Sequence, residues 1–151
     1  MKILFLDFDG VLNKLQPHEH TGPWSQAACA HIQTLLHKEP TLRIVFSTAW
    51  RHKGIDYCRG VLKECGIDPI RAIDCIPPVE EVGKLDREKE IRAWLDNNKH
   101  EGLFVIVDDY FAMPKFREKF VKTNSYVGFT EADLLKALEI LEHGKSQTEE
   151  K

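Results

Sequence analysis

Short apolar runs alternate with helix-like patterns along the chain. The runs predict strands at residues 2–8, 42–47, 70–75 and 103–107, with a short fifth strand at 124–127. These runs are continuous rather than alternating, which is typical of parallel strands that are covered on both faces. We therefore expect a parallel sheet of about five strands buried between helices.

The alternation of strands and helices predicts a three-layer, doubly wound α/β domain. We expect the domain to span residues 1–143, with a flexible tail at residues 144–151. Thr130 and Asp133 fit a capping box that has Asp in place of Glu. Apolar positions at one-face spacing predict helices over residues 25–38, around 61–62, over 87–96 and from Thr130 onward.

Two acidic pairs follow apolar strands. Asp7 and Asp9 leave the first strand on the same side, and Gly10 then permits a sharp turn. Asp108 and Asp109 end the fourth strand. Ligands of open parallel sheets bind at the carboxyl ends of the strands, so all four carboxylates meet if these strands are neighbours. Each pair alone would suit a helix cap or a loop, but the combination favours a Mg²⁺ site.

Hydroxyl and cationic side chains follow other predicted elements. Ser47 and Thr48 end the second strand, where they can bind a phosphate or simply cap a helix. Lys84 and Arg87 lie near the start of a helix, where a cation could offset the carboxylates and bind a phosphoryl oxygen. A solvated helix start would contain the same residues.

These segments resemble the motifs of the haloacid dehalogenase (HAD) superfamily. The D-x-D-G-V-L segment from Asp7, the strand that ends in Ser47 and Thr48, and the Asp108-Asp109 pair follow the order of its motifs. The segments FSTAWR, R-x-x-E-I-x-x-W-L and V-D-D are also similar to small HAD domains associated with RNA-repair proteins. The first and last motifs are specific in combination, whereas the others are loose.

The resemblance implies a phosphatase that forms a covalent intermediate. Asp7 would be the nucleophile that becomes an aspartyl-phosphate, and Asp9 would act as general acid and then general base. The side chains of Asp7 and Asp108 and the main-chain carbonyl of Asp9 would hold Mg²⁺, with Asp109 as a further ligand or as a partner of its water.

Two family roles each have two candidates in this chain. Either Ser47 or Thr48 would bind the phosphoryl group that is transferred. Arg87 fits the R-x-x-E-I pattern as the cation of the third motif, and Lys84 lies one helical turn earlier. We favour Arg87.

The chain leaves no room for the cap domain that covers small substrates in many HAD enzymes. An open site favours a large or exposed phosphate, such as a nucleic-acid end or a phosphoprotein, or a partner chain that acts as a lid. Gly10, Trp24 and Arg51 are our candidate substrate contacts. Trp24 could stack a base, but it could equally pack as a hydrophobic staple.

Charge adds little to this picture. The formal net charge of −3 gives no bulk argument for nucleic acid or membrane. Lys115, Lys119 and Lys122 have helical spacing and could track phosphates, although a solvated helix face is the more ordinary interpretation. No segment approaches the roughly 20 apolar residues that span a bilayer, and we expect a cytoplasmic location. The oligomeric state stays open.

Two other functions remain as alternatives. A phospho-accepting, receiver-like signalling domain has a similar sheet and acidic Mg²⁺ site, but its acceptor carboxylate ends the third strand. A catalytically silent binding module on the same scaffold would have no need of the four aspartates. A Mg²⁺-dependent phosphatase assay separates the enzyme from the silent module, and the lifetime of the phosphoenzyme separates it from the signalling domain.

Overall fold

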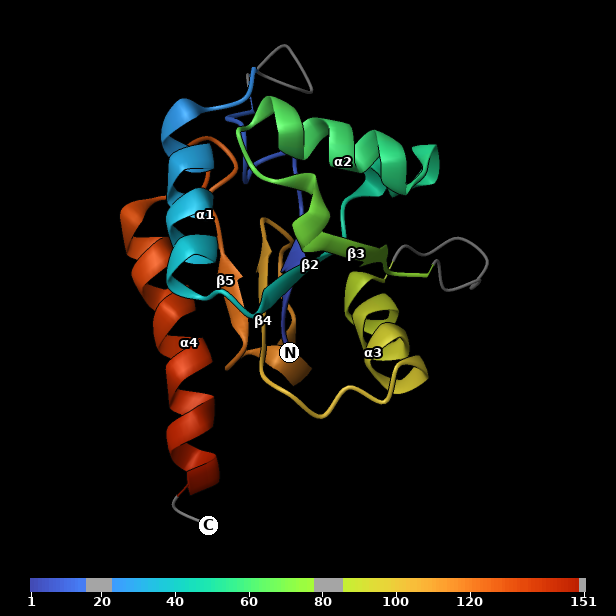
Figure 1. Ribbon diagram of the computed structural model, residues 1–151, viewed down its shortest axis with the longest axis vertical. Helices are drawn as coiled ribbons and strands as arrows, with labels where there is room; N and C mark the ends of the chain where they lie inside the picture. The colour runs from blue at the N-terminus through green and yellow to red at the C-terminus, as the bar shows by residue number, and fades with distance from the viewer. Residues whose placement is uncertain (16–22, 78–85, 150–151) are drawn as a thin grey trace.

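The computed structural model describes residues 1–15, 23–77 and 86–149. Its strands are parallel and form one sheet in the order β3-β2-β1-β4-β5 (Figure 1). The predicted adjacency of the first and fourth strands is therefore confirmed. The strands are β1 (Lys2–Leu6), β2 (Leu42–Phe46), β3 (Ala72–Cys75), β4 (Phe104–Asp108) and β5 (Phe120–Lys122).

Helices cover both faces of the sheet, because successive side chains of each strand point to opposite sides. Leu4 and Leu6 pack with apolar residues of α1, α2 and α4, whereas Ile3 and Phe5 pack with α3 on the other face. Figure 1 shows α1 and α4 side by side, with α3 on the opposite side of the sheet. The predicted three-layer fold is confirmed. The helices are α1 (Gln26–Lys38), α2 (Ile55–Glu64), α3 (Arg87–Asn97) and α4 (Glu131–Glu149).

Side-chain caps fix where two helices begin. The Ser25 hydroxyl accepts a hydrogen bond from the backbone N–H of Ala28 at the start of α1. Thr130 and Asp133 form the predicted capping box, in which each side chain accepts a hydrogen bond from the other's backbone N–H. The backbone of α4 continues to Glu149. The boundary that we placed after residue 143 stays a prediction.

The fifth strand lies earlier in the chain than we predicted. Phe120–Lys122 pairs with β4, whereas the predicted residues 124–127 form a tight turn that ends at Gly128. The carbonyl of Asn124 accepts hydrogen bonds from the N–H groups of Val127 and Gly128. Gly128 has a φ of +81°, which glycine adopts without strain. Asn and Gly at these positions are turn signals, and they outweigh the apolar character of Val127.

The prediction that Lys115, Lys119 and Lys122 share one face of a helix is also wrong. Lys115 lies in a short 3-10 turn, Pro114–Phe116, and Lys122 ends β5. The segment from Lys115 to Lys122 therefore contains a turn followed by a strand, so helical spacing does not apply. The Nζ atom of Lys122 donates a hydrogen bond to the carbonyl of Phe111.

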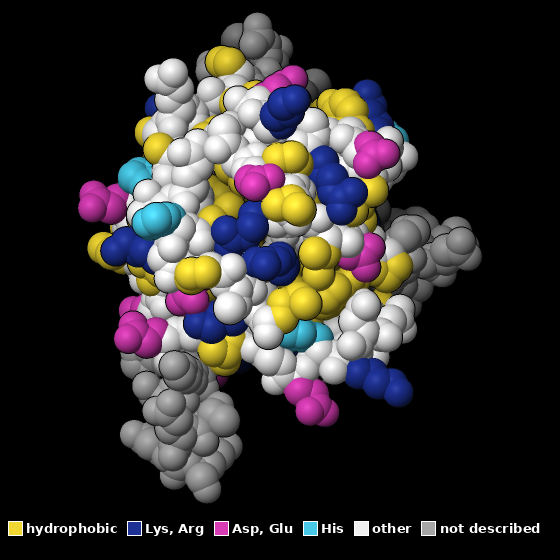
Figure 2. Space-filling view, in the orientation of Figure 1, with side chains coloured by type: hydrophobic (Ala, Val, Ile, Leu, Met, Phe, Trp, Pro, Cys, Tyr) yellow, Lys and Arg dark blue, Asp and Glu magenta, His cyan; other side chains and the backbone are white. Residues whose placement is uncertain are grey.

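The described part of the chain contains one sheet with its helices and no inserted cap domain. None of the described helices combines the length and apolar character that crossing a membrane requires. On the face in Figure 2, Lys and Arg side chains are interspersed with acidic and hydrophobic ones rather than gathered into one basic surface.

Candidate active site

Three carboxylates meet at the carboxyl ends of β1 and β4. Asp7 directly follows β1, Asp108 ends β4, and Asp109 follows it. One oxygen from each carboxylate lies within 4.8 Å of the others. The chain turns out of the strand after Asp108, which allows two consecutive residues to face the same site. The paired strands thus bring together three of the four aspartates that we expected to meet, and the Asp9 carboxylate is not part of this cluster.

Gly10 makes the close approach of Asp109 possible. Its φ is +79°, and a Cβ atom on this residue would lie 2.2 Å from Oδ2 of Asp109. Ser125 donates a hydrogen bond of 2.8 Å to the same oxygen. The N–H of Gly10 donates to the Asn13 side chain, and its carbonyl accepts from Thr123. Gly10, which we had expected to contact substrate, therefore has its backbone groups occupied and serves the packing of the site.

Arg87 at the start of α3 contacts this cluster with its guanidinium group. One guanidinium nitrogen, Nη1, lies 2.9 Å from Oδ2 of Asp108 and 3.5 Å from Oδ2 of Asp7. Burial alone would lower the pKa of Arg87, but Asp108 and Asp7 hold it above its usual value. Lys84, the other candidate for this cation, lies outside the described residues.

In the described parts of the chain, the three carboxylates of the cluster have one cationic partner, Arg87. Burial raises the pKa of Asp7 well above its usual value, and the nearby charge of Asp108 raises it further, while Arg87 acts in the opposite direction. Burial also raises the pKa of Asp108, against the effect of Arg87. Buried carboxylates at such close range require a cation or a proton.

The Asp9 carboxylate is held by two donors outside this cluster. Trp50 donates its indole N–H to Oδ2 at 2.7 Å, and Asn13 donates its amide N–H to Oδ1 at 2.9 Å. These contacts fix the orientation of the carboxylate. Our sequence analysis did not identify Asn13 or Trp50 as site residues, although Asn13 follows the first motif and Trp50 lies within the FSTAWR segment.

Ser47 and Thr48 have different environments. Thr48 caps the 3-10 helix Ala49–Lys53, because its hydroxyl accepts a hydrogen bond of 3.2 Å from the N–H of Trp50. The Ser47 hydroxyl is buried and has no hydrogen-bond partner in the described parts of the chain. Its position directly after β2 places Ser47 next to Asp7, because Leu6 pairs with Phe46. Ser47 is therefore the better candidate for binding a phosphoryl oxygen.

Arg51 has a structural set of partners. Its guanidinium donates to the backbone carbonyls of Ser47, Thr48 and Ile76, and it forms an ion pair with buried Glu90. These contacts tie the loop after β2 to α3. We had counted Arg51 among the substrate contacts. Its guanidinium N–H groups instead bind partners within the protein, so we do not propose that Arg51 contacts substrate.

Trp24 is half-buried, and its role as a contact of substrate stays a prediction. It packs edge-on against Phe8, with ring centroids 6.0 Å apart, and its indole N–H donates to Glu64. It also borders a cavity of about 350 Å³ beside Asp9. The cavity is mainly aromatic and apolar, and its lining residues are Phe8, Asp9, Pro23, Trp24, Trp50, Tyr57 and Val61.

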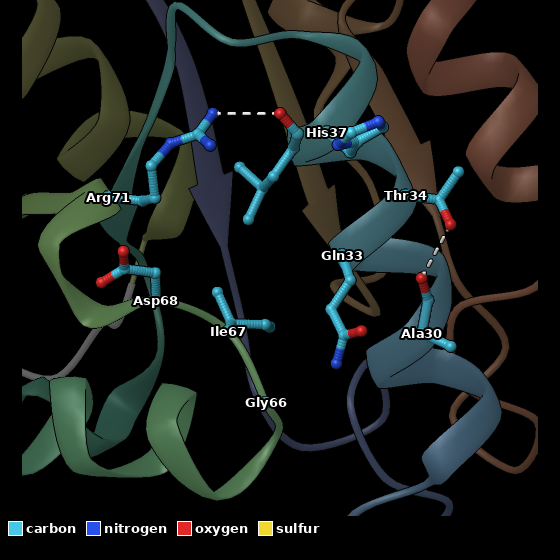
Figure 3. Close-up of a pocket in the computed structure, with 9 residues that line it drawn as sticks. Ala30, Gln33, Thr34, His37, Gly66, Ile67, Asp68 and Arg71 are labelled. Carbon is cyan, nitrogen blue, oxygen red and sulfur yellow. Dashed lines mark hydrogen bonds between the residues drawn. The ribbon is translucent and has the colours of Figure 1, made fainter.

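A second, larger cavity of about 540 Å³ lies between α1 and the segment that follows α2 (Figure 3). Arg71 borders it, but its guanidinium donates to the backbone carbonyls of Leu36, Glu39 and Leu42. Gln33 likewise donates to the carbonyl of Cys65. Because these polar groups hold the backbone together, we assign this cavity no chemistry.

The ligand set of the acidic cluster fits Mg²⁺. Mg²⁺ prefers a few carboxylate oxygens and completes its shell with water and substrate phosphate. Asp7, Asp108 and Asp109 supply such oxygens within one cluster. The Nε atom of Arg87 and the hydroxyl of Ser47 are buried polar atoms without partners among the described residues, and the oxygens of a phosphoryl group would satisfy both.

Comparison with known proteins identifies the family. Searches of curated proteins and of solved structures returned no match. Residues 3–134 match the family model described as "HAD domain in Swiss Army Knife RNA repair proteins". The match includes β1 from its second residue onward, the other four strands and every residue of the acidic cluster. The chain therefore belongs to this family of HAD domains.

Proposed function

We propose that the protein is a Mg²⁺-dependent phosphohydrolase that acts on phosphate monoesters through Asp7. The observation that carries the proposal is the cluster of three carboxylates with buried Arg87 against it. Asp7, Asp108 and Asp109 would hold Mg²⁺, which would shield the negative charge of the phosphate from the attacking carboxylate. We retain a cytoplasmic location as part of this proposal.

The reaction would proceed in two displacements at phosphorus. A carboxylate oxygen of Asp7 attacks phosphorus, while the bond to the leaving oxygen breaks and that oxygen takes a proton from Asp9. A water molecule then gives its proton back to Asp9 and attacks the phosphorus of the aspartyl-phosphate. Inorganic phosphate leaves and the Asp7 carboxylate is restored. Ser47 and Arg87 would bind phosphoryl oxygens in both steps.

A phosphorylated nucleic-acid end is the substrate class that we favour over a phosphoprotein. The family model is described as a domain of RNA repair proteins, and the described residues include no cap that would enclose a small substrate. A large substrate can use binding contacts away from the phosphate to position the reacting group. A mononucleotide lacks these contacts.

The test is hydrolysis of an aryl phosphate with and without Mg²⁺. We expect Asp7→Asn to abolish turnover, since an amide is a poor nucleophile of nearly the same size. Asp56→Asn is the matched control, because the Asp56 side chain is 99% exposed and lies in α2 outside the cluster. Undiminished activity of folded Asp7→Asn would remove Asp7 from this role. A phosphorylated oligonucleotide and a phosphopeptide are then compared as substrates.

A further inference from the structure

The cavity beside Asp9 has an unusual lining for a site that handles phosphate. Of its seven lining residues, Asp9 is the only one with a charge. Two aromatic pairs border it: Phe8 with Trp24, and Trp50 with Tyr57, whose centroids lie 6.1 Å apart. Such a lining suits a flat ring. The Nζ atom of Lys53 lies 5.1 Å from the centroid of the Trp50 ring and 4.9 Å from that of the Tyr57 ring, so a cation also borders these two rings.

The cavity is connected to the chemistry through Asp9. Trp50 borders the cavity and donates its indole N–H to Asp9. A general acid must lie within hydrogen-bond reach of the oxygen that it protonates. If Asp9 protonates the leaving oxygen, the group attached to that oxygen lies beside Asp9, where the cavity begins. The cavity is then the subsite of the leaving group.

The volume of the cavity favours a nucleoside. About 350 Å³ falls within the range of small-ligand pockets. A phosphotyrosine ring is joined directly to the leaving oxygen and would fill only the part next to Asp9. A terminal nucleotide places a sugar between the leaving oxygen and the base. The base can therefore reach the aromatic side chains that line the rest of the cavity.

We propose that the cavity lined by Trp24, Trp50 and Tyr57 binds the base of the phosphorylated terminal nucleotide. This inference rests on the proposed function, because it takes Asp9 as the group that protonates the leaving oxygen. Stacking on aromatic side chains tolerates any base, so the subsite would select for the presence of a base rather than for its identity.

Tyr57 is the residue to change. It is 42% exposed, so its replacement disturbs the core little, whereas Trp50 holds Asp9 and Trp24 packs against Phe8. Tyr57→Phe keeps the ring, so it should keep the preference for a substrate with a base. Tyr126→Ala is the matched control, because Tyr126 is 66% exposed and does not line the cavity.

The substrates are short oligonucleotides whose phosphorylated terminal nucleotide either carries adenine or is abasic. Both the 5′-phosphate and the 3′-phosphate forms are tested. We expect the base to raise kcat/KM for at least one form, and Tyr57→Ala to reduce that advantage about tenfold. Tyr57→Phe and Tyr126→Ala should keep it. Hydrolysis without any advantage of the base at either end would overturn the inference and leave the phosphohydrolase intact.

Binding of adenosine separates this inference from the reaction. Adenosine has no phosphate, and its binding should quench the fluorescence of the tryptophans that line the cavity. We expect this quenching in Asp7→Asn as well, and a weaker response in Tyr57→Ala. Quenching in a protein without phosphatase activity would support the subsite and contradict the proposed function. Equal binding of adenosine to Tyr57→Ala and to the unmodified protein would overturn the inference. So would a larger loss of kcat/KM in Tyr57→Ala for a phosphotyrosine peptide than for the oligonucleotide.

Discussion

Trp50 donates its indole N–H to Oδ2 of Asp9 across 2.7 Å. The two residues are 41 positions apart in the chain, and the contact joins the loop after β2 to the loop after β1. In the reaction that we propose, Asp9 gives and takes a proton, which requires a fixed orientation of its carboxylate. We therefore assign Trp50 a positioning role for Asp9.

Replacing Trp50 by Phe should lower kcat while the ring is kept. The lost hydrogen bond to a carboxylate corresponds to about 1.5 kcal/mol or more, which is roughly a tenfold loss of rate. Trp94→Phe is the control: it removes an indole donor of the same type from Asp74, on the α3 side of the sheet. A similar loss of activity in both variants would argue against the role of Trp50.

Gly10→Ala should inactivate the protein. The new Cβ atom would lie 2.2 Å from Oδ2 of Asp109 and would displace that carboxylate. Displacement by about 1 Å can cost on the order of 100-fold in rate. Gly54→Ala separates the clash from backbone strain, because Gly54 has a φ of +98° and nothing within 4 Å of its Cβ position. Both variants should lose about 1 kcal/mol of stability, but only Gly10→Ala should lose turnover and Mg²⁺ affinity.

Ser47→Ala should lower activity with little effect on stability, whereas Thr48→Ala should lower stability with little effect on activity. Ser47→Ala removes a buried hydroxyl without a partner among the described residues, so the free energy of unfolding should stay within about 0.5 kcal/mol or rise. Its kcat/KM should fall about tenfold, because a phosphoryl oxygen loses its donor. Thr48→Ala should instead destabilise by about 1 kcal/mol through the lost cap, with kcat/KM little changed. Urea unfolding and steady-state kinetics measure the two quantities, and the reverse pattern would assign the phosphate to Thr48.

Mg²⁺ should stabilise the protein more at high pH than at low pH. Burial raises the pKa of Asp7 and of Asp108, so the folded metal-free protein binds more protons than the unfolded chain does. The protonation of these two carboxyl groups stabilises the folded metal-free protein fully below about pH 4. This stabilisation is lost as the pH rises through the raised pKa values of Asp7 and Asp108. Melting temperatures with Mg²⁺ or with a chelator, between about pH 5 and pH 8, test this. A gain from Mg²⁺ that does not change with pH, or that persists in Asp108→Asn, would contradict it.

Glu90→Ala should be strongly destabilising. It leaves the guanidinium of Arg51 buried without its carboxylate, and losses of about 3–5 kcal/mol are typical of such changes. The double variant Arg51→Met with Glu90→Leu should recover much of this loss, because no charge remains buried. Asp96→Ala breaks the exposed ion pair with Arg92 and should change stability by less than about 0.5 kcal/mol. A small effect of Glu90→Ala would show that water reaches Arg51.

The sequence was informative where chemistry depends on strand ends. Asp7 and Asp108 follow buried apolar runs, and parallel strands present their carboxyl ends at one edge, so their meeting was predictable. The helix start at Thr130 was predictable as well, because a capping box is a local motif.

Contacts between distant loops were not predictable in this way. The use of Arg51 within the protein depends on Glu90 and on carbonyls that only the folded chain brings near. Ser47 and Thr48 differ in whether the hydroxyl has a hydrogen-bond partner among the described residues. The backbone turn after β2 brings the N–H of Trp50 to the Thr48 hydroxyl and not to that of Ser47. Our prediction of the fifth strand was wrong for a local reason. The strand Phe120–Lys122 has three residues, which is too short a run to show a strand pattern in the sequence.

The central position of β1 has a consequence for how the molecule opens. β1 is hydrogen-bonded to a strand on each edge and buried on both faces, so its amides should exchange with solvent only when the whole domain unfolds. The 3-10 helix that carries Trp50 contains no buried residue, so its amides should exchange before those of β1, although Arg51 and Trp50 hold it to Glu90 and Asp9. Asp7, the nucleophile that we propose, is therefore anchored to the slowest-exchanging part of the protein, whereas the cavity that we propose for the base is lined in part by a segment of lower local stability.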